Sequence, residues 1–246
     1  MRGNINMDYG IGIGCALFFS VLSTLILRSV AEYGIASIQT ADENSTVKEE
    51  DGGKAGDNRI HEQILPAEYI KYLVMVCITG IVVSVFLIWY YQQDLHYVVL
   101  TEAIISVLWA CSWYDRKYHL IPNRILVYSL ILRAVIFAVQ IAVNPGELRY
   151  ILLSSGIAAA ALMIGAILCR LLSPNSVGFG DVKLLGVMGL YLGINHVWSP
   201  IFVTLIILFV AGLYLLIFKK ADRKTEIPLA PFLLAGTVLA AIITGA

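Results

Sequence analysis

The sequence predicts an all-α, polytopic integral membrane protein with about eight transmembrane helices. Hydrophobic residues fill 59% of the 246 positions and charged residues only 14%, which is far from the composition of a soluble domain. The hydrophobic residues gather in runs close to the roughly 20 residues that a helix needs to cross the hydrocarbon core. Tyr and Trp recur at the ends of these runs, as expected of side chains in the headgroup region.

Eight apolar runs give the expected helices in chain order. The first run follows Arg2 and partly resembles a cleaved signal peptide, but Asp8 before it and Arg28 after it favour a retained span. The sixth run is short and interrupted by glycines, and the Asn195-His196 turn separates it from the seventh. The expected spans are 9–27, 69–91, 97–114, 121–143, 150–169, 182–195, 198–218 and 228–245.

Residues 29–68 contain the one long polar stretch, whose charged and Gly-rich composition predicts a mobile loop. The chain is therefore expected to consist of a first transmembrane helix (1–28), this loop (29–68) and a seven-helix core (69–246). The four cysteines lie singly in apolar runs, without the spacing of a zinc site or a disulfide framework. The sequence thus predicts packed thiols, no metal site and no cofactor.

Charge predicts the orientation of the chain in a plasma (inner) membrane. Lys plus Arg equal Asp plus Glu at 17 each, so the balance gives no indication of a nucleic-acid partner. The basic residues nevertheless gather on one side of the eight-span arrangement, and the opposite side has only Arg2 and Arg149. The positive-inside rule predicts that connections 28–68, 115–120, 170–181 and 219–227 are cytosolic and that both termini are outside.

Two acids, Asp115 and Asp181, fall at the cytosolic ends of the expected third and sixth helices. Each has a simple structural interpretation, because Asp115 could be a solvated helix-end acid beside Arg116 and Lys117, and Asp181 could cap its helix. Two carboxylates at the same depth on separate helices can also converge inside a bundle. Acids at the membrane boundary often mark a functional site, so we favour convergence.

A converging pair of carboxylates is suited to acid–base chemistry. Like charges a few ångströms apart do not both ionise, so the pair shares a proton. The ionised member can draw a proton from water while the protonated member polarises a peptide carbonyl, and the roles then reverse. Gly178 and Gly180 next to Asp181 fit this interpretation, since a backbone without Cβ atoms can approach an extended substrate closely.

Three blocks of sequence resemble the type IV prepilin peptidases, membrane aspartyl proteases with a Gly-x-Gly-Asp motif. The first is Asp115 followed by Ile121-Pro122-Asn123, and the second is Gly178-Phe179-Gly180-Asp181-Val182-Lys183. The third, Ile227-Pro228-Leu229-Ala230-Pro231-Phe232-Leu233, is similar to the start of the family's last helix. Gly-x-Gly-Asp alone is weakly specific, but the three blocks in this order are strongly so.

The resemblance implies an aspartic-type endopeptidase with Asp115 and Asp181 as its catalytic residues. Its partners would be the lipid bilayer and a type IV prepilin or pseudopilin, whose short basic leader it would remove at the cytosolic membrane boundary. The remaining site residues that the resemblance implies are Gly178, Gly180, Lys183, Pro122, Asn123, Pro228 and Pro231. A structural interpretation stays open for several of them, since a lysine can snorkel to the interface and Pro122 and Pro228 can fix a first helical turn.

One departure from the family pattern concerns a second activity. Many bacterial members also methylate the new amino terminus and carry paired cysteines in their first cytosolic loop, whereas residues 29–68 have no cysteine. We therefore expect a peptidase without that zinc module and leave N-methylation open.

Two rival functions use the same acids differently. In a presenilin-like or signal-peptide-peptidase-like intramembrane protease the pair would cut within the substrate's helix, and in an ion- or proton-coupled transporter it would relay a cation. A relay would need groups at the midplane, where Arg133 and Glu102 are the only charged residues we place. We expect these two to form an ion pair between the third and fourth helices.

Overall fold

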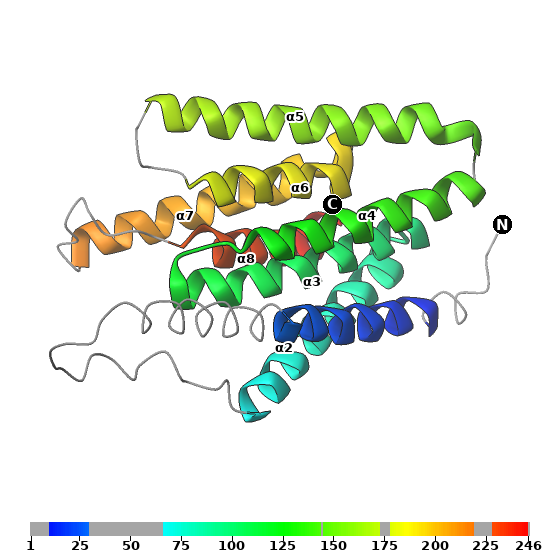
Figure 1. Ribbon diagram of the computed structural model, residues 1–246, viewed down its shortest axis with the longest axis horizontal. Coiled ribbons are helices and arrows are strands. Elements are labelled where there is room, and N and C mark those ends of the chain that lie inside the picture. Colours follow the sequence, from blue (N-terminus) through cyan, green and yellow to red (C-terminus); the bar gives the residue numbers. More distant parts are fainter. Residues whose placement is uncertain (1–9, 30–65, 144, 173–177, 219–227, 246) are drawn as a thin grey trace, which may run out of the picture.

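The computed structural model of the chain describes residues 10–29, 66–143, 145–172, 178–218 and 228–245, which form helices and no strand (Figure 1). The predicted all-α class is therefore confirmed. Most of the predicted loop 29–68 lies outside the described residues. The helices are Gly10–Ser29, α2 (Pro66–Val85), η1 (Phe86–Tyr90), α3 (Leu95–Tyr118), α4 (Asn123–Val143), η2 (Pro145–Glu147), α5 (Leu148–Leu172), α6 (Phe179–His196), α7 (Trp198–Phe218) and α8 (Leu229–Thr244).

Six helices of the described part of the chain are long and apolar enough to cross a membrane. They are Gly10–Ser29, Ile70–Tyr90, Leu95–Tyr118, Asn123–Val143, Pro145–Leu172 and Trp198–Ile217. The polytopic membrane class is confirmed, whereas the count of eight spans stays a prediction. The two other expected spans are α8, which has 16 residues, and α6, whose path is broken at Gly193.

Helix α3 forms the centre of the bundle, and α2, α4, α6 and α8 all pack against it. In an 18-residue stretch of α3, 78% of the residues are buried, compared with 11% in α7. The large apolar side chains of α7 point outward, as expected of a helix with lipid on most of its surface. The central position of α3 explains how Asp115 near its end is enclosed by neighbouring helices.

Glycines allow α6 and α8 to lie close to their partner helices. A Cβ atom at Gly189 of α6 would lie 2.6 Å from the backbone N of Ala159 in α5. A Cβ atom at Gly236 of α8 would lie 2.9 Å from Cα of Thr204 in α7. Such small residues let helix backbones approach in a membrane bundle, where van der Waals packing drives association.

The predicted ion pair between Glu102 and Arg133 is wrong. The Arg133 side chain turns toward α6, where its Nε–H donates to the carbonyl of Leu190 at 2.8 Å. The Glu102 carboxylate instead accepts a hydrogen bond at 3.0 Å from the hydroxyl of Ser84 in α2. Counting residues along the helices puts the two side chains at similar depths, but each binds a different neighbouring helix, Glu102 to α2 and Arg133 to α6.

A break in α6 explains why Arg133 turns this way. Gly193 has φ 66° and ψ 176°, a conformation that interrupts the helix and that glycine adopts readily. The N–H of Ile194 then donates to the hydroxyl of Ser154 at 3.1 Å and not to the carbonyl of Leu190, its partner in a regular helix. The Leu190 carbonyl, next to this break, accepts the hydrogen bond from Arg133.

Candidate active site

Asp115 lies in the last turn of α3 and is 6% exposed, although its neighbours Arg116 and Lys117 are exposed. Its Oδ2 atom accepts a hydrogen bond at 2.9 Å from the backbone N–H of Ala230, in the first turn of α8. The positive end of the α8 dipole and the unpaired N–H groups of that turn favour a carboxylate at this position. The interpretation of Asp115 as a solvated helix-end acid is therefore wrong.

Asp181 is half-buried at the start of α6, as the third residue of that helix. Its Oδ2 atom accepts the backbone N–H of Gly178 at 3.1 Å, and Gly178 itself is the N-cap residue. The expected capping interaction thus exists, but the carboxylate provides it from inside the first turn. Since one backbone N–H engages only one of its two oxygens, the carboxylate retains the capacity to bind a water molecule or a substrate.

The two carboxylates are close enough to influence one another electrostatically. Partial burial raises the pKa of Asp181, the hydrogen bond from Gly178 opposes this rise, and the charge of Asp115 adds to it. Both acids thus lie at the same end of the bundle, as their matched depth predicts, while the close approach that a shared proton needs stays a prediction.

The start of α6 packs directly on the connection between α3 and α4, at the left-hand end of the bundle in Figure 1. A Cβ atom at Gly180 would lie 3.1 Å from Cβ of Ile121, which is tighter than an ordinary contact. The Lys183 ammonium donates to the Asn123 side-chain oxygen at 2.9 Å. Lys183 therefore has a specific partner from the first sequence block, which simple snorkelling to the interface does not require.

The prolines of the first and third blocks lie at the starts of helices. Pro122 immediately precedes α4, and its carbonyl accepts the N–H of Ile125 at 3.1 Å. Pro228 is the N-cap of α8, outside the first turn that the sequence suggested, while Pro231 lies within that turn. A proline in a first turn removes an N–H group that has no helical partner anyway. Ile227, the first residue of the third block, lies outside the described residues.

All nine predicted site residues therefore lie at one end of the bundle, where the three sequence blocks meet. The structure adds two groups that the sequence did not single out, the Ile121 side chain under Gly180 and the Ala230 amide on Asp115. The Ala230 contribution is a backbone group, for which residue type carries no signal. In the described part of the chain, no three His, Cys, Asp or Glu residues cluster in a way that could hold a metal ion.

Comparisons with known proteins relate the same part of the chain to one family. Residues 102–217 match the type IV leader peptidase family, a range that includes Asp115 and Asp181. The chain is 30% identical over 136 residues to a prepilin leader peptidase/N-methyltransferase of Bacillus subtilis (strain 168). The alignment covers 55% of this chain and 52% of that protein, so the chain spans about half the length of this relative. No solved structure matches.

Proposed function

We propose, from the match of residues 102–217 to the type IV leader peptidase family, that this chain is a membrane aspartic endopeptidase. The proposed substrates are type IV prepilins or pseudopilins, which lose a short basic leader at the cytosolic boundary of the plasma (inner) membrane. In the proposed orientation the two acids face the cytosol, both termini lie outside, and the 29–68 loop lies in the cytosol. The observation that carries the proposal is the buried Asp115, held against α8, within electrostatic reach of Asp181.

In the proposed reaction the pair acts on a water molecule and on the scissile carbonyl. Each carboxylate is held by a backbone N–H through its Oδ2 atom, so both are oriented before substrate arrives. The ionised carboxylate takes a proton from the water as its oxygen attacks the carbonyl carbon, and the protonated one donates a hydrogen bond to the carbonyl oxygen. Return of a proton to the leaving nitrogen then breaks the peptide bond and restores the shared proton.

The place of the pair at one end of the bundle suits a substrate that joins a polar leader to an apolar helix. The helix can remain in lipid while the junction reaches the two acids from the side. Incubation of the full-length chain with a synthetic peptide containing a basic leader and the start of an apolar helix tests this directly. We expect mass spectrometry to detect a cut at the junction; an intact peptide would contradict the proposal.

Gly180→Ala is expected to lower the rate of leader cleavage about tenfold, because a displacement well below 1 Å at a positioned group already slows catalysis. The added Cβ would lie 3.1 Å from Cβ of Ile121, so either Ile121 or the start of α6 has to move by a few tenths of an ångström. We expect part of that movement to reach Asp181, the next residue. Gly165→Ala in α5 is the matched control, since a Cβ there meets nothing within 4 Å. Equal initial rates for both variants would show that the close contact at Gly180 has no part in positioning Asp181.

N-methylation is a separate question, because the relative's name includes that activity and this chain lacks cysteines between residues 29 and 68. We propose a peptidase without the cysteine-bound zinc module. With S-adenosylmethionine present, we expect the cleaved peptide to keep an unmodified amino terminus. A gain of one methyl group in the mass spectrum would overturn this narrower assignment and leave the peptidase proposal intact.

A further inference from the structure

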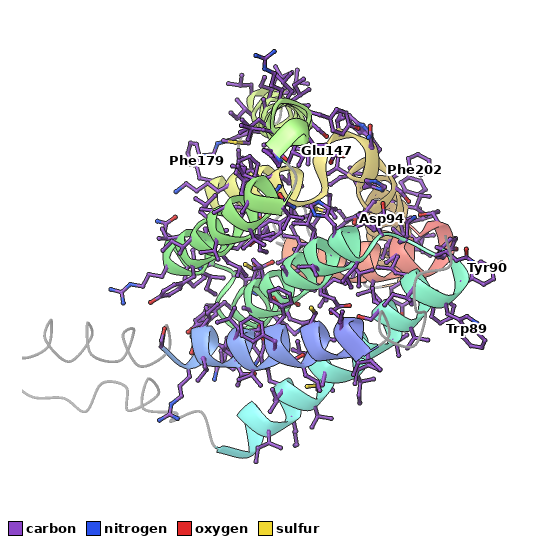
Figure 2. All side chains as sticks on the ribbon, turned by 90° about the vertical axis from the view of Figure 1, so that its right-hand side faces the viewer. Trp89, Tyr90, Asp94, Glu147, Phe179 and Phe202 are labelled. Carbon is purple, nitrogen blue, oxygen red and sulfur yellow. The ribbon has the colours of Figure 1, made fainter. Side chains whose placement is uncertain are left out.

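A second polar feature lies at the opposite end of the bundle from Asp115 and Asp181. It is a cavity of about 760 Å³ lined by the first residues of α3 and α5 and the last residues of α4 and α6. Figure 2 looks onto this end and labels Asp94 and Glu147, two acids of the lining that are exposed at the rim. The proposed peptidase reaction uses none of these residues.

The deepest charged group of the lining is Arg133, which is 5% exposed. Its guanidinium donates to the Leu190 carbonyl at 2.8 Å, the Gln140 side-chain oxygen at 3.1 Å and the Ser155 hydroxyl at 3.3 Å. All three partners are neutral. An arginine has five N–H donors, so one donor on each terminal nitrogen has no partner within the described structure.

A buried cation without a counter-charge is costly, because partners of opposite charge must replace the water that it loses on burial. Neither Asp94 nor Glu147 forms a hydrogen bond with Arg133. The rings of Phe137 and Tyr191 lie 5.4 and 5.8 Å from its Cζ atom, but an aromatic face accepts none of the in-plane N–H groups. A free donor on each of the two terminal nitrogens matches two oxygens of a phosphate, which arginine binds with a planar fork.

A chain of hydrogen bonds holds the guanidinium in place before any ligand arrives. Because the Gln140 oxygen accepts from Arg133, its amide nitrogen faces the His96 ring, 2.9 Å from Nδ1 and 2.8 Å from Nε2. The third partner of the guanidinium is the Leu190 carbonyl, which lies beside the break at Gly193 and accepts from Nε. A site whose donors are already oriented loses less entropy on binding.

We propose that this cavity binds an anionic phosphate group, with Arg133 as its direct partner. Two sources share this chemistry, a phospholipid headgroup that enters from the bilayer and free phosphate that enters from water. The bilayer route is open because Val139 and Val143 of the lining are 58% and 70% exposed on the outer surface of α4. The proposal is independent of the peptidase assignment.

Thermal unfolding of the full chain in neutral detergent tests the proposal with three probes. These are inorganic phosphate, dioleoylphosphatidylglycerol, and dioleoylglycerol as a phosphate-free control with the same acyl chains. A ligand at about 100 times its Kd is expected to raise the unfolding midpoint by about 5 °C. If only phosphatidylglycerol raises the unfolding midpoint, the ligand is a lipid headgroup. If inorganic phosphate raises it as well, the site is also open to free phosphate.

Two variants locate the binding in this cavity. Arg133→Gln removes the cation and is expected to abolish the rise in unfolding midpoint with either phosphate probe. Val139→Trp fills the entrance from the bilayer while leaving the hydrogen bonds of Arg133 in place, and is expected to abolish the rise with phosphatidylglycerol. Val135→Trp is the matched control for the second variant, because Val135 is 56% exposed on the same helix and does not line the cavity. If Arg133→Gln does not fold, the two tryptophan variants decide the question. An unchanged rise with phosphatidylglycerol in Val139→Trp, an unchanged rise in folded Arg133→Gln, or no rise with either phosphate probe in the unaltered chain, overturns the proposal.

Discussion

Asp115→Asn and Asp181→Asn should each lower the rate of prepilin leader cleavage by about 10³-fold, within the range that general acid–base groups contribute. Asparagine keeps the shape of the side chain but can neither take a proton from water nor give one to the leaving nitrogen. In the Asp115→Asn variant the Ala230 N–H can still donate to the amide oxygen of the new side chain, so the contact between α3 and α8 is preserved. Initial rates with a leader peptide, normalised to the amount of folded protein, measure the effect.

Asp94→Asn is the matched control, because Asp94 is an exposed carboxylate just before the other end of the same helix, α3. It is expected to cleave at the rate of the unaltered chain. The double variant of Asp115 and Asp181 should be about as slow as either single variant, since residues that act as a unit are not additive. Full cleavage by either single variant would remove that residue from catalysis, and altered ion flux without proteolysis would favour a transporter.

The position of the two acids illustrates what helix counting can predict. The lengths of the apolar runs and the distribution of basic residues place Asp115 and Asp181 at a common depth, and that depth predicts their convergence. Burial of Asp115 could not be predicted in this way, because it depends on the first turn of α8, more than a hundred residues later. The sequence of that turn shows its prolines, but the group that binds Asp115 is a backbone N–H.

Arg133 illustrates where the same approach fails. Its depth along α4 predicts a position near Glu102, and nothing in the sequence of α4 indicates which neighbour its side chain will meet. The outcome depends on the backbone of α6, where Gly193 adopts a positive φ beside the Leu190 carbonyl that Arg133 binds. Glycines interrupt that run in the sequence, yet which of them breaks the helix depends on contacts with α5.

Gly189→Ala is expected to destabilise the protein by about 1–3 kcal/mol, the usual cost of forcing extra volume into a well-packed interior. A Cβ atom at Gly189 would lie 2.6 Å from the backbone N and 2.7 Å from the Cα of Ala159, and a backbone cannot move aside as a flexible side chain can. Helices α5 and α6 must therefore separate. Denaturant unfolding in detergent measures the loss of stability.

Gly165→Ala provides a control of opposite expected sign. Alanine favours a helix over glycine by roughly 0.5–1 kcal/mol, and a Cβ at Gly165 meets no atom within 4 Å, so this variant should be as stable as the original or more so. Equal stability of the two variants would mean that α5 and α6 are not in backbone contact at Gly189.

The Gly189 variant also separates packing from chemistry. Gly189 lies eight residues after Asp181 in α6, about 12 Å along the helix axis, so it cannot contact a substrate bound at the acids. Displacement of α6 by the added methyl group should nevertheless move Asp181 relative to Asp115, because Asp115 is held independently by α8. We therefore expect folded Gly189→Ala protein to cleave more slowly than Gly165→Ala protein. Equal cleavage by folded protein would mean that the shift in α6 is absorbed before it reaches Asp181.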